Sequence, residues 1–282
     1  MNDIELKNVS YKYPLSESFA LKDFHFTFKK GKFYGIIGSN SGGKTTLCNL
    51  VRGLIPHFYQ GDLSGEVLIE GTDVREWDSQ LLSTKIGYIF QNPFTQISGV
   101  RETVLEEIAL GLENLGVEKD EMIDRVIDVV KLLKIEDLIK KNPNNLSGGQ
   151  RQRVAFASII AMNNDILVID EPTSQLDPET TSDVFEIINM LKAQGKTILL
   201  VEHKVDLITE YSDEVIVMEK GQMVYNGSPS EVFSNKDLLS RGAAFPQVAL
   251  LSHEMKMLDK PFDYIAITKS QAKEQIMKRM GL

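Results

Sequence analysis

The sequence predicts an α/β fold, and three observations support this prediction. An apolar segment at residues 33–37 is followed by a glycine-rich loop and then by apolar residues at helical spacing, which indicates strand, loop and helix in succession. A continuous apolar run at residues 166–169 is typical of a buried parallel strand, and two carboxylates follow it. Residues 20–28 alternate between apolar and polar side chains, which predicts a half-buried strand of an antiparallel sheet.

Length and composition limit the possible classes of protein. The 282 residues, 42% of them apolar, suit one large domain with an appendage. A formal charge of −9 argues against a nucleic-acid partner and against direct adhesion to anionic lipid. The single cysteine, Cys48, fits a reducing cytosol, and we expect it to pack in the core. We expect neither a signal peptide nor a membrane span, so any membrane association needs a protein partner.

The elements before residue 100 are predicted to be mainly strands. Residues 4–13, with apolar side chains at Ile4, Leu6 and Val9, are predicted to form an edge strand. The half-buried strand at 20–28 comes next. A further strand at 65–71 lies between two glycines, and another at 85–90 ends just before Gln91. The sequence shows no helical pattern between the early strands, and these strands are therefore predicted to be antiparallel.

Residues 100–141 are predicted to be helical, and Pro143 interrupts this region. One apolar stripe consists of Val104, Ile108 and Leu112. Ser147 is then a suitable N-cap for a helix that runs to Met162. A second stripe consists of Ile123, Val126, Ile127, Val130 and Leu133.

The rest of the chain continues the α/β alternation before its character changes. We predict strands at 165–170 and 197–202, a helix at 184–192, and a hairpin around residues 220–221. Beyond Pro229, one helix begins near Pro246, and Thr268 begins a capping-box pattern for the last helix. We therefore predict a domain at 1–230, with a helical subdomain at about 95–160, and an appendage at 231–282 that packs on the domain or on a partner.

A glycine-rich loop follows the strand at 33–37 and matches G-x-x-x-x-G-K-[ST] at every fixed position. Its glycines let backbone N–H groups surround phosphate oxygens, and the following helix N-terminus favours anions. Lys44 would reach the β- and γ-phosphates, and Thr45 would bind Mg²⁺. The strand and helix on either side make a chance glycine turn a poor alternative. The residues expected to bind ATP are Tyr13, Gly38, Ser39, Asn40, Ser41, Gly42, Gly43, Lys44, Thr45 and Thr46.

A second glycine-rich segment lies about a hundred residues later and opens the helix capped by Ser147. A single molecule cannot easily direct both segments at the same phosphate, although each favours an anion. The pair therefore predicts a nucleotide held between two surfaces, with a partner chain completing the site. The second segment consists of Leu146, Ser147, Gly148, Gly149 and Gln150.

Polar residues follow three predicted strands where ligands bind in parallel α/β sheets. Asp170 is predicted to hold Mg²⁺, and Glu171 to orient or deprotonate an attacking water. Gln91 would contact the metal or the water, and His203 the γ-phosphate. Taken singly, these residues have simpler interpretations. The two carboxylates could be a solvated strand end, Gln91 a surface glutamine and His203 a structural histidine. Context favours the functional interpretation.

An aromatic ring near the end of the first strand is predicted to stack on adenine. Tyr13 is our choice and Tyr11 is its competitor. Periodicity does not decide between the two rings, and core packing is an alternative for either.

Together these motifs resemble the ATP-binding subunits of ABC transporters over residues 2–230. Residues 38–45 are similar to Walker A, 146–150 to the signature and 166–170 to Walker B, with Glu171 at the position of the catalytic base. Gln91 is similar to the Q-loop residue and His203 to the switch histidine. The resemblance implies a P-loop NTPase (RecA-like) core, an N-terminal antiparallel β-subdomain, an α-helical signature subdomain and a small helical appendage. It also implies ATP hydrolysis with Mg²⁺ at Thr45, Gln91 and Asp170. The D-loop would be Ser174, Gln175, Leu176 and Asp177.

Further features resemble the energy-coupling factor (ECF) branch, which imports vitamins and transition-metal ions. These features are residues 90–93 followed by Gln96, residues 172–178 with Gln175, and residues 245–248. This resemblance implies a head-to-tail dimer with the same or a homologous chain, on the cytoplasmic face of the membrane. Integral-membrane subunits would contact residues 91–111, and the appendage would support dimerisation. The cargo and the choice between homodimer and heterodimer stay open.

Other classes of ABC protein are the competing interpretations. A soluble ABC ATPase of DNA repair is disfavoured because no sustained heptads separate the two glycine-rich segments. A translation factor usually carries two cassettes, and this chain has one. An ATPase subunit of another ABC transporter class is a further alternative. A regulatory ATP-binding subunit is disfavoured by the presence of Glu171 and His203.

Overall fold

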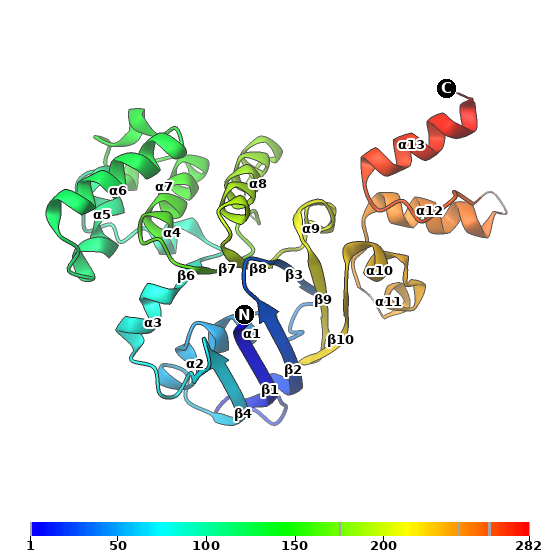
Figure 1. The fold of residues 1–282 in the computed structure, drawn as a ribbon, viewed down its shortest axis with the longest axis horizontal. Helices are drawn as coiled ribbons and strands as arrows, with labels where there is room; N and C mark the ends of the chain where they lie inside the picture. Colours follow the sequence, from blue (N-terminus) through cyan, green and yellow to red (C-terminus); the bar gives the residue numbers. More distant parts are fainter. Residues whose placement is uncertain (1, 175, 242, 259–260, 282) are drawn as a thin grey trace.

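Two β-sheets form the centre of the chain (Figure 1). The computed structural model describes residues 2–174, 176–241, 243–258 and 261–281. Within them, an antiparallel sheet has the order β2 (Leu21–Lys29), β1 (Asn2–Lys12), β4 (Asp62–Ile69) and β5 (Thr72–Asp73). A larger sheet has the order β10 (Gln222–Gly227), β9 (Glu214–Glu219), β3 (Phe33–Gly38), β8 (Thr197–Val201), β7 (Ile166–Asp170) and β6 (Ile86–Ile89).

The prediction of an edge strand at residues 4–13 is wrong, because β1 lies inside its sheet. Ile4 pairs with Phe28 of β2 on one side and with Ile69 of β4 on the other. β4 also begins at Asp62, so Gly65 lies within the strand and not before it. Local alternation could not reveal this, because pairing with β4 joins segments nearly sixty residues apart. The antiparallel arrangement itself is confirmed.

The larger sheet is parallel from β6 to β9, and β10 forms the predicted hairpin with β9. Every residue of β7 is buried. Ile166 and Val168 pack in one core cluster, whereas Leu167 and Ile169 pack in the other, on the opposite face. Burial on both faces explains why this strand is a continuous apolar run.

Helices lie on both faces of the larger sheet (Figure 1). α1 packs in the cluster shared with the antiparallel sheet, and its Cys48 is buried as expected. α7, α8 and α9 contribute to the cluster on the other face. The helices are α1 (Lys44–Val51), α2 (Leu54–His57), α3 (Ser79–Lys85), α4 (Pro93–Gln96), α5 (Val104–Asn114), α6 (Lys119–Leu132), α7 (Gly148–Ala161), α8 (Pro178–Ala193), α9 (Val205–Tyr211), α10 (Pro229–Ser234), α11 (Lys236–Ser240), α12 (Gln247–Met257) and α13 (Lys269–Met280), with 3₁₀ turns at Glu136–Leu138 and Pro143–Asn145.

The helical region confirms the first apolar stripe and corrects the second. Val104, Ile108 and Leu112 on α5 are all fully buried. On α6, however, Ile123 is 45% exposed and Ile127 is 39% exposed. The buried face of α6 is Val126, Val129 and Val130. α6 packs against α5 and α7 on one of its sides. It therefore buries a narrow stripe of side chains, and the apolar residues beside that stripe are partly exposed.

The C-terminal helices are joined to the main core. α10 crosses residue 230, and its Val232 and Phe233 are fully buried in the main cluster. His253 of α12 forms a 3.0 Å hydrogen bond with the Phe233 carbonyl. The predicted capping box of Thr268 begins α13. α12 and α13 extend away from the sheets at the end opposite α5 and α6 (Figure 1).

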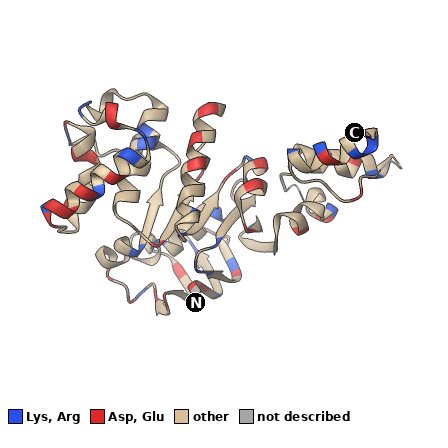
Figure 2. Cartoon of the chain, turned by 45° about the horizontal axis from the view of Figure 1, so that its top comes forward, with Lys and Arg blue, Asp and Glu red and all other residues tan. Residues whose placement is uncertain are grey.

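In the view of Figure 2, acidic and basic segments are interspersed over the helical part of the chain. No helix in the described ranges is long and apolar enough to cross a membrane.

Candidate functional site

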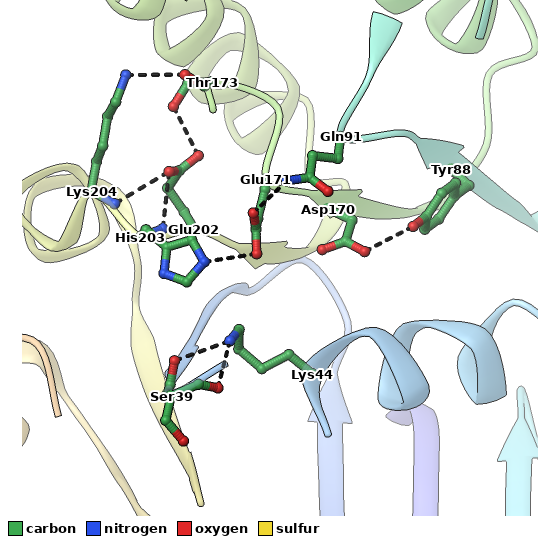
Figure 3. Close-up of polar contacts among 11 residues, drawn as sticks. Ser39, Lys44, Tyr88, Gln91, Asp170, Glu171, Thr173, Glu202, His203 and Lys204 are labelled. Atoms are coloured by element: carbon green, nitrogen blue, oxygen red, sulfur yellow. Dashed lines mark hydrogen bonds and ion pairs between the residues drawn. The ribbon is translucent and has the colours of Figure 1, made fainter. Parts of the chain in front are cut away.

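The loop at residues 38–45 wraps around its own lysine. Lys44 Nζ donates hydrogen bonds of 3.0 Å to the carbonyl oxygens of Gly38 and Ser39 (Figure 3). Gly43 has a φ of 99°, and a Cβ there would lie 2.6 Å from the Ala20 carbonyl oxygen. Glycine is therefore required by both backbone conformation and close packing. Burial lowers the pKa of the Lys44 ammonium, and the carboxylates of Glu171 and Asp170 oppose this shift.

A cavity of about 620 Å³ opens above this loop, and we name it the phosphate-loop cavity. It brings together the loop with three polar side chains predicted from separate strand ends. The segment at residues 16–20 forms another wall that sequence reasoning missed, because it is an irregular loop with no periodic signal. The lining residues are Tyr13, Ser16, Ser18, Phe19, Ala20, Asn40, Ser41, Gly42, Gly43, Lys44, Thr45, Thr46, Gln91, Glu171 and His203.

The Glu171 carboxylate is held between two other strand-end residues (Figure 3). Gln91 Nε2 donates to one oxygen at 2.8 Å, and His203 Nε2 lies 2.8 Å from the other. Glu171 has a φ of 47°, which is unusual for a residue other than glycine. Its N–H donates to the Val201 carbonyl of β8 at 2.8 Å, so the neighbouring strand holds this conformation. Such local strain is typical of functional positions.

Asp170 ends β7 and is 6% exposed. Burial raises the pKa of its carboxyl group, whereas hydrogen bonds from the hydroxyls of Tyr88 and Thr45 oppose the shift. The Tyr88 hydroxyl donates at 3.1 Å, and the Arg52 guanidinium lies 3.7 Å from the Tyr88 ring centroid. Sequence reasoning missed Tyr88, because its contacts with Asp170 and Arg52 come from distant parts of the chain.

The oxygen atoms of Thr45 and Asp170 fit a magnesium ion. Mg²⁺ usually takes one or two protein oxygens and completes its shell with phosphates and water. A dedicated cage of side chains is therefore not needed. No cluster of three or more His, Cys, Asp or Glu residues that could hold a metal is found in the described segments.

The structure treats the two candidate tyrosines differently. Tyr11 is fully buried, and its hydroxyl donates to the Gln60 carbonyl at 3.0 Å. Tyr13 lines the phosphate-loop cavity, and its hydroxyl lies 3.4 Å from the Thr46 hydroxyl. The Tyr11 ring packs edge-on against Tyr13 with the centroids 4.8 Å apart. This geometry favours Tyr13 as the ring available to a base.

The second glycine-rich segment lines a different cavity of about 490 Å³, which we name the signature cavity. Ser147 caps α7 by accepting from the Gln150 N–H, and the Gln150 side chain accepts from the Ser147 N–H at 3.2 Å. Leu146 is buried beneath it. Of the predicted D-loop, Leu176 and Asp177 line this cavity, Ser174 does not, and Gln175 lies outside the described residues. The lining residues are Ser147, Gly148, Gly149, Gln150, Arg153, Leu176, Asp177, Glu179, Thr180 and Asp183.

Comparison with protein families gives a match over residues 21–174 to the family described as ABC transporter. An ABC transporter ATP-binding protein of Pyrococcus abyssi is 44% identical over 91% of this chain and 91% of its own length. The energy-coupling factor transporter ATP-binding protein EcfA1 of Streptococcus sanguinis is 36% identical over 98% of this chain and 97% of its own.

Solved structures agree. CbiO1 from Clostridium perfringens, described as part of the ABC transporter complex CbiONQ, superposes with a TM-score of 0.73 at 30% identity. The match covers 85% of this chain and 94% of CbiO1. An ATP-binding cassette solved as a dimer in a post-hydrolysis state, bound to ADP and phosphate, superposes with a TM-score of 0.69 at 28% identity. That match covers 80% of this chain and 98% of the cassette.

Proposed function

The chain belongs to the ABC transporter ATP-binding family, and on this premise we propose that it is the energy-coupling ATPase of an ECF-type importer. It is an ATP-hydrolysing transporter subunit by its family. The proposal adds that two ATPase chains, identical or homologous, meet head to tail and close on two ATP molecules. Their closure drives integral-membrane subunits that take up a vitamin or a metal ion. The likeness to EcfA1 and to CbiO1 supports this branch.

The observation that carries the dimer proposal is the separation of the two cavities. The two sets of lining residues share no member among the described residues. In a head-to-tail pair, the phosphate-loop cavity of one chain would face the signature cavity of the other. The N-terminus of α7 would then supply N–H groups to the γ-phosphate of the partner's nucleotide.

The side chains of the phosphate-loop cavity suit hydrolysis at the γ-phosphate. Lys44 and the loop N–H groups would bind the phosphates, and the Tyr13 ring would stack on adenine. The Glu171 carboxylate would accept a proton from the attacking water, and His203 and Gln91 would hold that carboxylate in position. Thr45 and Asp170 would hold Mg²⁺, and Gln91, whose amide N–H donates to Glu171, would contribute its amide oxygen as a third ligand. When bound, the ion would neutralise charge on the phosphate oxygens.

We also propose that residues 231–282 form an assembly region. Several apolar side chains are exposed on α12 and α13 within the described ranges, including Ile276 at 42% and Met280 at 67%. Because α10 packs in the main core, deletion from residue 231 would also damage the ATPase domain. Ile276→Glu together with Met280→Glu is the milder test. The dimerisation constant should weaken while the melting temperature stays near wild type; an unchanged constant would contradict this role.

The transport function is tested by uptake in cells that lack the native chain. Cells complemented with wild type should take up a labelled vitamin or transition-metal ion, whereas cells with Glu171→Gln should not. Affinity purification from native membranes should recover integral-membrane subunits with both versions. The proposal would be contradicted if the purified chain carried no integral-membrane subunit and if uptake were the same in cells with and without it. That result would favour a soluble ABC ATPase.

A further inference from the structure

A buried carboxylate with no role so far contacts the segments that lead to both cavities. Glu202 follows β8 and is 2% exposed. One of its oxygens accepts from the backbone N–H groups of His203 at 2.9 Å and Lys204 at 3.2 Å. The other oxygen accepts from the Thr173 hydroxyl at 2.9 Å (Figure 3). A buried carboxylate is costly unless hydrogen bonds satisfy it, and each oxygen of Glu202 has partners on a different segment.

The Thr173 side of this contact leads to the signature cavity. Thr173 is fully buried, and its carbonyl accepts from the Leu176 N–H at 3.2 Å. The same carbonyl accepts from Lys204 Nζ at 3.1 Å, and that ammonium also donates to the Thr181 hydroxyl of α8 at 2.8 Å. Leu176 itself lines the signature cavity. The segment after β7 is therefore tied to the segment after β8 at two points.

The His203 side leads to the phosphate-loop cavity. The His203 ring contacts Glu171 and lines this cavity, while its backbone N–H is held by Glu202. We propose that Glu202 is a positioning residue that couples the two cavities of one chain. It joins the backbone of His203 to Thr173, and through the Thr173 carbonyl to Leu176, so that a change at the γ-phosphate in one cavity shifts the wall of the other. This inference rests on the proposed function, since it concerns two nucleotide sites in a dimer.

A simpler role for Glu202 is to fix the backbone between β8 and α9. That role needs only the oxygen that accepts from the backbone of His203 and Lys204. Coupling also needs the oxygen that accepts from the Thr173 hydroxyl. Thr173→Val separates the two roles, because it removes the hydroxyl, keeps the shape of the side chain, and leaves the backbone hydrogen bonds of Glu202 in place. Thr173→Ser keeps the hydroxyl and is the matched control.

The experiment measures steady-state ATP hydrolysis by the full-length chain in its working dimer, as a function of ATP concentration. We expect Thr173→Val to lower kcat at least fivefold and to bring the Hill coefficient for ATP close to one. The half-saturating ATP concentration should stay close to wild type. The melting temperature should fall in Thr173→Val, because a buried oxygen of Glu202 loses its donor, and Thr173→Ser should restore both kcat and the melting temperature. Lys204→Met removes the second link between the two segments, the hydrogen bond from Lys204 Nζ to the Thr173 carbonyl. It should also lower kcat, and it replaces Thr173→Val as the test if that variant does not fold.

Unchanged kcat and Hill coefficient in the folded Thr173→Val protein would overturn the inference. Equal losses of kcat with Val and Ser, measured well below both melting temperatures, would also overturn it in favour of a packing role. The wild type serves as the check on the proposed function. An inactive wild-type dimer would contradict the ATPase itself, whereas an active wild type with an unaffected Thr173→Val contradicts only the coupling.

Discussion

The phosphate-loop cavity and the signature cavity differ in their chemistry, and in the proposed dimer they form the two halves of a nucleotide site. The first holds the ammonium of Lys44, an aromatic ring and the carboxylate of Glu171 between two polar partners. The second is built on the N-terminus of α7, whose first turn carries no acidic residue. The first can therefore bind the nucleotide and activate water, while the second offers a helix N-terminus that favours an anion. In the proposed head-to-tail dimer, hydrolysis requires both cavities.

The positions of the acidic residues in the signature cavity add to the chemical difference between the two cavities. They come from α8 and the turn before it, where Asp177 caps the helix and accepts from the Thr180 N–H at 2.9 Å. Asp183 pairs with Arg153 of α7. An anion is thus favoured on the α7 side of the cavity and disfavoured on the α8 side. This asymmetry suits a phosphate presented by a partner chain from one direction.

The largest predicted effect lies in the phosphate-loop cavity. Glu171→Gln keeps the shape of the side chain but removes the proton acceptor. Turnover should fall by about 10² to 10⁴, which is the usual contribution of a general base. ATP affinity should be retained, and the closed dimer should accumulate on size-exclusion chromatography with ATP. Near-normal phosphate release by this variant would remove Glu171 from the role of base.

The second-largest effect is expected for a substitution in the signature cavity. Ser147→Ala removes the side-chain cap of α7, and turnover should fall about tenfold as the anion site at the helix N-terminus weakens. Binding of a fluorescent ATP analogue to the monomer should change less than about twofold, because the monomer binds through the other cavity. Ser147→Thr keeps a capping hydroxyl and is the control. Equal loss of monomer binding would show that both cavities serve one nucleotide.

A smaller effect concerns the adenine end of the phosphate-loop cavity. Tyr13→Ala should raise the Kd for ATP about fivefold, because one ring stacking on the base contributes about 1 kcal/mol. Binding of inorganic triphosphate, which has no base, should stay the same. Tyr11→Phe removes the hydroxyl contacts with the Tyr59 and Gln60 carbonyls, keeps the ring, and should leave both affinities close to wild type. An unchanged Kd for ATP in the folded Tyr13→Ala protein, measured by calorimetry, would contradict the stacking role of Tyr13.

The smallest effect concerns the support of Asp170. Tyr88→Phe removes the hydroxyl that donates to the carboxylate and leaves the ring beneath Arg52. The Mg²⁺ concentration for half-maximal hydrolysis should rise about threefold, in keeping with the loss of one hydrogen bond. This concentration is measured by following ATP hydrolysis while Mg²⁺ is added to a solution without Ca²⁺. An unchanged requirement would mean that the hydroxyl does not position the metal-binding carboxylate.

Contiguous motifs made much of this structure predictable from the sequence. The strand, loop and helix around Lys44 lie next to one another in the chain, and the N-cap of Ser147 is defined within four residues. The features that could not be predicted depend on distant contacts. Edge and central strands share the same alternation, so the place of β1 inside its sheet required knowledge of β4.

The same reasoning applies within the site. Gln91, Glu171 and His203 were predicted because each follows a recognisable strand, and the topology brings those strand ends together. Tyr88 and Glu202 were missed because their partners lie 82 and 29 residues away along the chain. Tyr13 and Tyr11 could be told apart only by their burial, which depends on contacts with Gln60 and Thr46.

The most direct test of the central claim is a cross-link between the two cavities across the dimer. Ser41→Cys and Ser147→Cys are placed in separate chains of different mass; the native Cys48 is buried, and burial raises the pKa of its thiol well above the ordinary value. Under mild oxidation with a Glu171→Gln background, ATP should produce a covalent heterodimer only when both chains are mixed. A double-cysteine chain that links within itself, or a mixture that does not link with ATP, would contradict the account.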